Sequence, residues 1–445
     1  MKSFALINGK VVDTKTGKLD TVNLLIVNGK VAGIGYLPDE DDNLDVIDIS
    51  GCVVIPEIID SWAYTGEPKD NVREGFESVG NAAVTSGITT VALAAYGNQS
   101  IDSPELLEAY INKAKKECAA TVLAVTSLTK ENNGKQLAEL GLLALAGAAA
   151  FTDGNSCINS AFMRNALKYS SMLNAAIFIA PSDSDLDIDG DMNEGHYSTI
   201  LGLKGMPVAS EEIRIARDIK LAEQYGGRLH FLISSAGSVE LIKQAKEKGL
   251  NITAAVTPNH LYFTEADLDG YDTNLKIYPP LRTEQDQKAL IQGLKDGVVD
   301  VITSQHTPCL LDEKRAEFNN AKIGISGIDL FLPLVLNKLF HQEKMSLADI
   351  TKKISNNPLK LLNKKRTGIR LNSSPNFTVI DLGEERKIKE TDILSKSKNT
   401  PFIGKKLKGF AKLTVVDGKI CFNALPIKKA KDVSFTGDRH SSSSL

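Results

Sequence analysis

The sequence has few of the residues that build metal centres and disulfide frameworks, with six histidines, five cysteines and one tryptophan in 445 residues. The cysteines are odd in number, scattered and without CxxC spacing, which is typical of a reduced protein and predicts a cytoplasmic location. No apolar run approaches the roughly 20 residues that a transmembrane helix needs, so we expect no membrane insertion. Residues 1–13 predict strands rather than a secretory signal.

An excess of one charge is also missing. The chain has 52 Lys and Arg residues against 55 Asp and Glu residues, a net charge of −3, and no dense basic block. Nucleic acid is therefore not an expected partner. A hydrophobic content of 42% is ordinary for a globular protein, and the length predicts more than one domain-sized unit.

Both ends of the chain are rich in β-forming residues. Asn-Gly pairs at 8–9 and 28–29 lie between apolar runs, which indicates hairpins and a small antiparallel sheet over residues 1–51. Residues 363–430 return to this pattern with an Asp-Gly turn, so we expect both ends to pair into one satellite domain. Residues 431–445 lack apolar periodicity and predict a disordered tail.

Residues 52–362 alternate short apolar strands with amphipathic helices, the latter expected at 103–118, 238–249 and 284–297. Most of the strands are continuous apolar runs, which indicates burial on both faces. The eight predicted strands span residues 52–60, 89–96, 121–128, 148–153, 175–180, 228–234, 251–258 and 300–306. Eight such units predict an α/β protein with a (β/α)8 TIM barrel and a small β-sheet satellite.

The active site of a TIM barrel lies at the carboxyl ends of its strands. The residues expected there are Asp60, Trp62, Tyr64, Tyr96, Asp153, Ala180, Ile233, Thr257 to His260, Gln305, His306 and Cys309. Hydrolysis by a bound metal needs three or more His, Asp, Glu or Cys donors for each ion. Asp153, His306 and Cys309 offer that chemistry, which is too little for an ordinary metallohydrolase.

A series of segments in fixed order covers nearly the whole chain, and it includes VIPEIID, AFTDG, ILGLKGMPVASEE, YPPLRTEQDQKALI, DVITSQHTP and NTPFIGKKLKG. The series resembles the dihydroorotases of the amidohydrolase superfamily, and in particular those members that lack the metal ligands. The resemblance implies a barrel with a β satellite and a family zinc site. The strand-one DxHxH pattern of active members reads DSWAY here.

The resemblance also implies which residues occupy the zinc positions. Trp62 and Tyr64 replace the two DxHxH histidines, Ala180 replaces the histidine of strand five, and Ile233 stands at the ligand position of HxxH. The bridging aspartate is retained as Asp153. We therefore expect no cofactor and a lost zinc site, because neither alanine nor isoleucine can bind zinc.

The substrate positions implied by the resemblance differ as well. Gly66 and Tyr96 stand where an arginine and an asparagine hold the substrate carboxylate, and Tyr278 replaces another asparagine. Gln305 replaces the aspartate that serves as metal ligand and general base, and Cys309 replaces a histidine that contacts substrate. Glutamine cannot accept a proton as a carboxylate does, so no catalytic residue is expected.

Each retained or replaced residue has a second interpretation. The aromatic residues fill the volume left by metals and substrate, or they line a new ligand pocket. Asp153 is a hydrogen-bonded structural carboxylate, or it helps to hold a single ion. His306 and His260 are packing residues; alternatively, His306 forms a thiolate site with Cys309 and Cys157.

The resemblance implies a catalytically silent dihydroorotase homologue that serves as a structural or regulatory partner of aspartate carbamoyltransferase in pyrimidine biosynthesis. A homo- or hetero-oligomer is expected. One alternative is an active cyclic amidohydrolase with an atypical site. Another is a small-molecule sensor that uses the vacated barrel mouth, which a cavity with a polar lining would favour over a mouth plugged by aromatic residues.

Overall fold

The computed structural model describes residues 3–12, 19–35, 43–69, 71–95, 99–156, 158–187, 189–365 and 368–432. Tyr96, Cys157 and residues 433–445 of the predicted tail lie outside this part of the chain. No helix within the described ranges is both long and apolar enough to cross a membrane.

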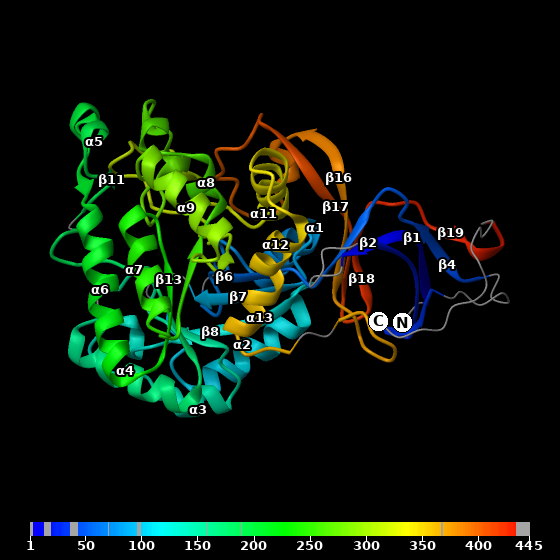
Figure 1. The fold of residues 1–445 in the computed structure, drawn as a ribbon, viewed down its shortest axis with the longest axis horizontal. Helices are drawn as coiled ribbons and strands as arrows, with labels where there is room; N and C mark the ends of the chain where they lie inside the picture. Colours follow the sequence, from blue (N-terminus) through cyan, green and yellow to red (C-terminus); the bar gives the residue numbers. More distant parts are fainter. Residues whose placement is uncertain are drawn as a thin grey trace.

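Eight parallel strands form the barrel that the sequence predicts, on the left of Figure 1. Their order in the sheet, β15-β14-β13-β10-β9-β8-β7-β6, follows the chain. The strands are β6 (Ile59–Thr65), β7 (Thr90–Ala95), β8 (Thr121–Ser127), β9 (Ala150–Thr152), β10 (Ala176–Ile179), β13 (Arg228–Leu232), β14 (Ile252–Val256) and β15 (Val301–Ile302). Most of their residues are buried. This is expected because helices cover the outer face of a barrel sheet and side chains fill its interior.

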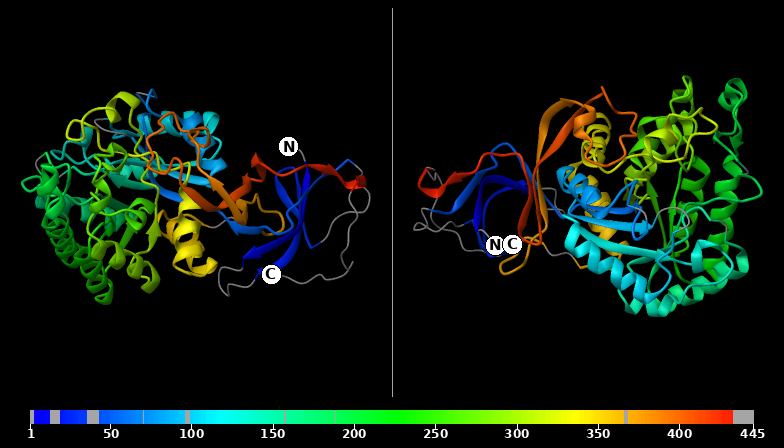
Figure 2. Two further views of the ribbon diagram at one scale, coloured as in Figure 1. Left: turned by 90° about the horizontal axis from the view of Figure 1, so that it is seen from above. Right: turned by 180° about the vertical axis from the view of Figure 1, so that it is seen from behind.

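Helices surround the barrel, as the views in Figures 1 and 2 show. Those that follow the strands are α1 (Phe76–Thr85), α2 (Pro104–Glu117), α3 (Leu140–Leu145), α4 (Ser160–Leu173), α6 (Val208–Tyr225), α7 (Ala236–Glu247) and α9 (Glu284–Asp296). The three helices predicted from periodicity, α2, α7 and α9, form within two residues of the expected bounds. Ser103 caps α2 by accepting a hydrogen bond from the Leu106 amide, and Thr283 and Asp286 form a capping box at α9.

Shorter elements complete the barrel. After β15 the chain forms α10 (Leu311–Lys314), α11 (Phe331–Val335), α12 (Leu347–Thr351) and α13 (Asn357–Leu361), with π-helical turns η4 (Leu336–Gln342) and η5 (Lys352–Asn356). The loop after β10 carries β11 (Met192–Asn193), α5 (His196–Leu201) and β12 (Gly205–Met206), and α8 (Pro258–Tyr262) follows β14.

A separate, mainly antiparallel sheet combines both chain ends, and Figure 2 shows its blue and orange-red strands side by side. Its order is β18-β17-β16-β5-β1-β2-β3, with β4 beside β1 and β19 beside β4. The strands are β1 (Phe4–Val12), β2 (Leu19–Val27), β3 (Lys30–Ile34), β4 (Asp45–Asp48), β5 (Val53–Pro56), β16 (Phe377–Lys387), β17 (Lys406–Val416), β18 (Lys419–Asn423) and β19 (Lys428–Lys429). This sheet is the predicted satellite.

One of the two predicted Asn-Gly hairpins is wrong. Asn28 and Gly29 do turn the chain from β2 into β3, but Asn8 and Gly9 lie inside the continuous strand β1. There they form a bulge, with Asn8 at a φ of +61° and the pairing with β2 shifted between Leu6 and Gly9. A Cβ on Gly9 would come within 2.3 Å of Ile49 Cδ1, so close packing rather than a turn accounts for the glycine.

The predicted first barrel strand, residues 52–60, is also wrong as a single strand. Residues 53–56 form β5, which pairs with β1 and β16 in the satellite sheet, and the barrel begins at Ile59 in β6. Between them, the buried carboxylate of Glu57 accepts hydrogen bonds from Asn376 Nδ2 at 3.3 Å and from Thr90 Oγ1 at 3.5 Å. One continuous apolar run therefore serves two sheets, and Glu57 links them.

The satellite packs on the barrel through β16 and β17. Thr378 Oγ1 donates to the Gly87 carbonyl at 2.6 Å, and Thr414 Oγ1 donates to the Val84 carbonyl at 2.7 Å. Gly87 has a φ of +89°, and a Cβ there would lie 2.9 Å from side-chain atoms of Leu332 and Thr378. These contacts fix the satellite against the first barrel helix.

Candidate functional site

A buried carboxylate joins the first and last strands of the barrel. Asp60 in β6 accepts hydrogen bonds from Thr303 Oγ1 at 2.7 Å, the Ser304 amide at 3.0 Å and the Ser304 hydroxyl. The side chain is fully buried, and burial raises the pKa of Asp60 against the lowering effect of these bonds. Asp60 therefore closes the barrel rather than facing a substrate.

Trp62 occupies the barrel interior. It is fully buried, and its ring centroid lies 5.4 Å from that of Phe178 and 6.3 Å from that of Tyr64. Small side chains on other strands, including Ala92, Ala94 and Ala255, belong to the same cluster and make room for the indole. Its Nε1 atom is buried with no hydrogen-bond partner among the described residues. Trp62 therefore packs as an apolar residue at a position where the resemblance implies a zinc-binding histidine.

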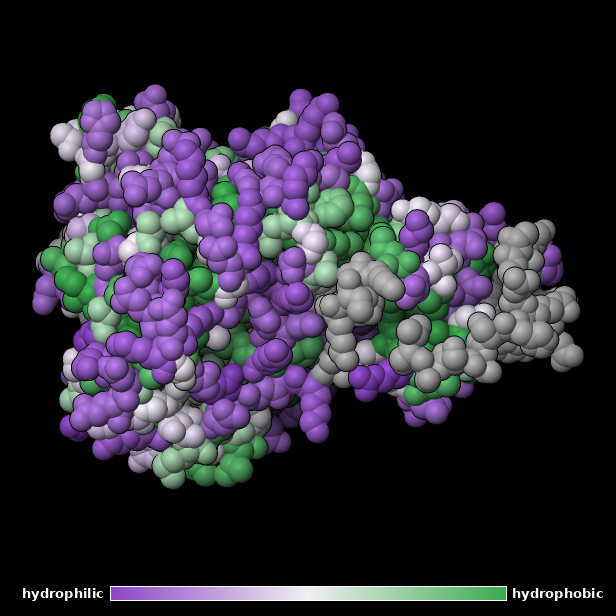
Figure 3. Space-filling model, in the orientation of Figure 1, coloured by the Kyte–Doolittle hydropathy of each residue, from purple (hydrophilic) through white to green (hydrophobic). Residues whose placement is uncertain are grey.

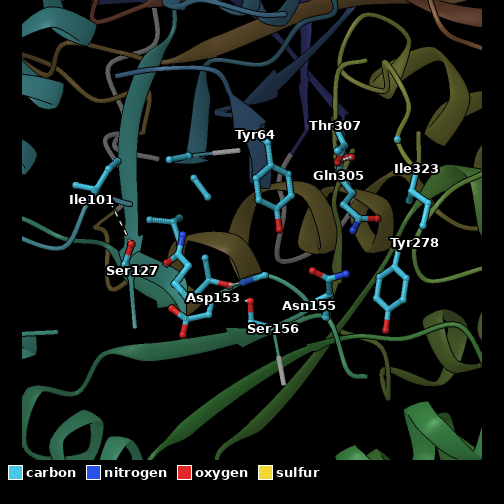
Figure 4. A pocket seen from close by; sticks show the side chains of 18 of the residues that line it. Tyr64, Ile101, Ser127, Asp153, Asn155, Ser156, Tyr278, Gln305, Thr307 and Ile323 are labelled. Atoms are coloured by element: carbon cyan, nitrogen blue, oxygen red, sulfur yellow. Dashed lines mark hydrogen bonds between the residues drawn. The ribbon is translucent and has the colours of Figure 1, made fainter. Parts of the chain in front are cut away.

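A cavity of about 270 Å³ lies above this cluster, at the carboxyl ends of the strands. Figure 4 shows Tyr64, Asn155 and Gln305 extending into it. The polar residues that line it are Tyr64, Thr126, Ser127, Asn132, Thr152, Asp153, Asn155, Ser156, Tyr278, Gln305 and Thr307. Of the sequence-predicted site residues, the cavity brings together Tyr64, Asp153, Ala180, Tyr278 and Gln305. The mouth is therefore narrowed by aromatic residues but not plugged.

Asp153 is held tightly in the cavity wall. Its Oδ1 atom accepts the amides of Leu128 and Thr129, each at 2.9 Å, and its Oδ2 atom accepts the Thr129 hydroxyl. Burial raises the pKa of Asp153, and the bonds from Thr129 and Leu128 oppose that rise. The carboxylate thus connects β9 to the loop after β8.

Tyr278 forms the opposite wall. Its hydroxyl donates to the Pro181 carbonyl at 2.6 Å and lies 3.4 Å from Asp187 Oδ2. Burial raises the pKa of Tyr278 far above its ordinary value, so the phenol stays protonated. The hydroxyl group is hydrogen-bonded outside the cavity, so the ring of Tyr278 lines the cavity.

Gln305 follows β15, with a backbone φ of +46° in the left-handed region that favours glycine. The residue is 8% exposed, and its side-chain amide makes no hydrogen bond to the described residues. Its backbone carbonyl accepts the Thr307 hydroxyl at 2.9 Å. Gln305 is therefore held by its backbone while its amide remains available to the cavity.

The histidines that the sequence retains are buried in packing roles, away from the cavity lining. His306 Nδ1 accepts the Gly327 amide at 3.3 Å, and its Nε2 lies 3.3 Å from Glu74 Oε2. His260 lies between Thr257 Oγ1 at 2.8 Å and the Pro279 carbonyl at 3.0 Å, and burial lowers its pKa to about 4. Burial likewise lowers the pKa of His230 to about 3.

The remaining predicted positions lie apart from the cavity. Gly66 donates its amide to the Glu74 carbonyl at 3.0 Å. Ile233 is fully buried in the core between strands and helices, and Cys309 is buried with a pKa raised by that burial. Tyr96 and Cys157 lie outside the described residues, so the structure does not address the predicted contacts of either.

Asn132 is a cavity residue that the sequence reasoning missed. Its Nδ2 donates to the Gln99 carbonyl at 2.8 Å, whereas its Oδ1 is buried without a hydrogen-bond partner among the described residues. Asn132 follows β8, so its place in a loop after a barrel strand was a usable signal.

The side chains present do not fit the zinc site that the resemblance implies. Across the described ranges, no group of three or more His, Cys, Asp or Glu side chains is placed to hold a metal ion. Asp153 has its oxygens occupied by two amides and a hydroxyl, and alanine and isoleucine offer no donor. Among the described residues that line the cavity, Asp153 is the one Asp, Glu, Lys, Arg or His side chain.

Comparison with known proteins agrees with this architecture. Residues 51–240 match a family model described as Dihydro-orotase-like. A dihydroorotase of Ruminiclostridium cellulolyticum is 38% identical over 413 residues, covering 92% of this chain and 96% of that protein. A dihydroorotase of Carboxydothermus hydrogenoformans is 37% identical over 421 residues, covering 94% and 97%.

Two solved structures share this fold. A dihydropyrimidinase from Brevibacillus agri has a TM-score of 0.82 at 19% identity, with 95% of each chain covered. An L-hydantoinase (dihydropyrimidinase) from Arthrobacter aurescens has a TM-score of 0.83 at 20% identity, covering 96% of this chain and 98% of that one. At these identities the likeness shows the fold alone.

Proposed function

We propose that this chain, which belongs to the dihydroorotase family, is a catalytically silent member that acts as a partner of another enzyme. The observation that carries the first part is the composition of the barrel mouth. Its one carboxylate, Asp153, is already bound by the Leu128 and Thr129 amides. By the family resemblance, Gln305 stands where the general base would be.

The chemistry of amide hydrolysis supports this proposal. Attack on an amide carbonyl at neutral pH requires a metal-bound hydroxide or a base that accepts a proton from water. Gln305 cannot accept that proton, and no described histidine lines the cavity. Gly66 provides no cation for a substrate carboxylate. An active enzyme with an atypical site remains the alternative to be tested by turnover.

The partner we propose is aspartate carbamoyltransferase, in pyrimidine biosynthesis in the cytoplasm. The family resemblance supplies this partner, since ligand-lacking relatives of dihydroorotases assemble with that enzyme. One exposed surface suits such a contact. On the neighbouring helices α3 and α4, Leu145 is 85% exposed and Met172 is 82% exposed, with Leu142 and Tyr169 about half exposed. Figure 3 shows hydrophobic side chains along this lower edge of the molecule, over α3.

Mixing experiments test the partner. We expect the two purified proteins to elute together on sizing as a hetero-oligomer, because a stable contact buries about 1,000 Å² or more. Leu145→Glu with Met172→Glu should separate them. Ile200→Glu on α5, where Ile200 is also exposed, is the matched control and should leave the complex intact. Separate elution of the unmodified proteins, with unchanged transferase activity and melting temperature, would refute the partnership.

The cavity favours a second candidate function. A mouth plugged by aromatic residues would serve only as a scaffold, but Tyr64 and Tyr278 leave about 270 Å³ lined by both polar and apolar residues. A small-molecule sensor is therefore the second candidate, and it is compatible with partner binding.

A further inference from the structure

The face at the amino ends of the barrel strands, opposite the cavity described above, carries an exposed apolar cluster. Helix α3 ends at Leu145 shortly before β9 begins, and α4 ends at Leu173 shortly before β10 begins, so both helices end at this face. Figure 1 shows them along the lower side of the barrel. Leu145 and Met172 are almost fully exposed there, and Leu142 and Tyr169 are about half exposed.

Hydrogen bonds join this cluster to a distant segment of the chain. The carbonyl of Asn174, two residues after Met172, accepts Arg228 Nη1 at 2.8 Å and also accepts Asn363 Nδ2. Arg228 Nη2 donates to the carbonyls of residues 360–361, each at 3.0 Å. The end of α4 and the segment after α13 therefore form one continuous surface.

That segment is strongly basic. Residues 350–380 contain seven Lys and Arg residues and no Asp or Glu, in a chain whose net charge is −3. Lys360, Lys364 and Lys365 are exposed, and none of them makes an ion pair within the described ranges. On α4, exposed Lys168 precedes Met172 by one helical turn, with its Nζ 5.1 Å from the ring centroid of Tyr225. Positive side chains thus border the apolar cluster.

A cavity of about 340 Å³ lies between the apolar and the basic residues. Its described wall comes from the ends of α4, α6 and α7 and from the turns that follow these helices. Glu223 in this wall is already paired, with Lys220 at 2.7 Å and with Lys248 at 3.4 Å. Arg228, also in the wall, bonds to four uncharged oxygens.

These charges decide what each part of the surface can receive. Helix carboxyl ends carry partial negative charge, which Arg228 offsets, so the cavity suits an uncharged side chain. The three unpaired lysines at its border suit carboxylates. Leu145 and Met172 suit apolar side chains, because contact with another apolar surface removes them from water.

We propose that this face is the docking surface for a protein partner that presents an apolar centre bordered by acidic side chains. The assignment rests on the proposed role as a partner of another enzyme, and it adds the charge that the partner must carry. A nucleic acid fits this surface less well, since it would offer Leu145 and Met172 a phosphate backbone rather than apolar groups.

Three helical peptides of about 15 residues test this chemistry on the full chain. The first has leucines along one face bordered by glutamates, the second has lysines in place of the glutamates, and the third has serines in place of the leucines. By fluorescence anisotropy, the first should bind at least about tenfold more tightly than the others, and its binding should weaken with added salt. Equal binding of either other peptide, no binding at about 1 mM, or equally tight binding of a short DNA duplex would overturn the proposal.

Variants locate the surface. Leu145→Glu with Met172→Glu should weaken binding of the first peptide about tenfold or more. Lys360→Glu with Lys364→Glu should weaken it similarly and remove most of its salt dependence. All four side chains are exposed, so we expect both variants to fold. If the glutamate pair at Leu145 and Met172 does not fold, Leu145→Ser with Met172→Ser replaces it.

The matched control has the same change of charge at another place. Lys387, at the end of β16, and Lys389 are exposed and make no ion pair within the described part of the chain. Lys387→Glu with Lys389→Glu should leave peptide affinity unchanged. An equal loss in this control, or unchanged affinity in both variants of the docking surface, would overturn the assignment.

Sizing with aspartate carbamoyltransferase separates this inference from the proposed function. Co-elution that Lys360→Glu with Lys364→Glu leaves unchanged would refute the docking surface but not the partnership. Separate elution, together with peptide binding that the variants abolish, would refute that partner and leave the docking surface standing.

Discussion

The double substitution Trp62→His with Tyr64→His restores the DxHxH pattern in the sequence. We expect the double variant to gain neither activity nor zinc, because Ala180, Ile233 and Gln305 still lack donor and base chemistry. We also expect it to be less stable than the unmodified protein, since Trp62 is fully buried against Phe178.

The expected decrease in the free energy of unfolding can be worked out from the packing of Trp62. A tryptophan side chain buries about 200 Å², worth about 5 kcal/mol at roughly 25 cal/mol per Å², and imidazole recovers about half of it. Burying the imidazole nitrogens unpaired costs about 1 to 3 kcal/mol, which the release of the unpaired Trp62 Nε1 partly offsets. Tyr64 is only partly buried, so its replacement adds about 1 kcal/mol at most. Together these contributions lower the free energy of unfolding by about 3 to 4 kcal/mol.

Thermal and urea unfolding measure this difference. An unfolding entropy of roughly 2.1 cal/mol/K per residue predicts a melting temperature about 3 to 4 °C lower if the chain unfolds in one step. Tyr64→His alone is the control and should shift it by about 1 °C or less. Trp62 is the one tryptophan of the chain, so its fluorescence reports directly on the barrel interior. A double variant that melts with the unmodified protein, or a Trp62 emission typical of solvent exposure, would refute the packing argument.

Three further outcomes are expected. Elemental analysis after dialysis should find below about 0.1 zinc per chain. One or more tightly held ions would contradict the argument that too few side chains are placed to bind zinc. The pure protein should neither hydrolyse dihydroorotate nor condense carbamoyl aspartate; turnover that survives purification and disappears in Asp153→Asn would contradict catalytic silence. Because burial lowers the pKa of His260 to about 4, the unfolded chain binds a proton that the folded chain does not, and stability falls as pH drops below about 6.5. Between pH 6.5 and 5.5 this loss is about 1 kcal/mol, which urea titrations should find missing in His260→Gln.

The barrel, the satellite and most element positions could be predicted because they depend on periodicity and on the order of segments along the chain. Local geometry was harder to predict. Asn8-Gly9 and Asn28-Gly29 are identical dipeptides, yet one is a bulge packed on Ile49 and the other a hairpin turn. Which of them turns depends on contacts with residues far along the chain, which a local pattern does not contain.

In the candidate site, too, some features could be predicted from the sequence and others depend on the folded structure. That Trp62 and Ala180 offer no side-chain donor suited to zinc can be read from residue types alone; the resemblance supplies the expectation that ligands would stand there. The unpaired amide of Gln305 and the buried Oδ1 of Asn132 depend on backbone angles and on the neighbours that each side chain lacks. The sequence identified the position of Gln305 but gave no indication that its amide remains unpaired.

The shared sheet sets an order of events during translation. Strand β5 needs β16 as its neighbour, and Asn376, which bonds Glu57 at the junction, is synthesised 319 residues later. At about 5 to 20 residues per second the ribosome needs tens of seconds to supply that neighbour. Throughout this time Val53, Val54 and Ile55 present an apolar strand edge that can pair with another nascent chain. Chains released before β16 should therefore aggregate, and the full chain should depend on chaperones more than a barrel with self-contained ends.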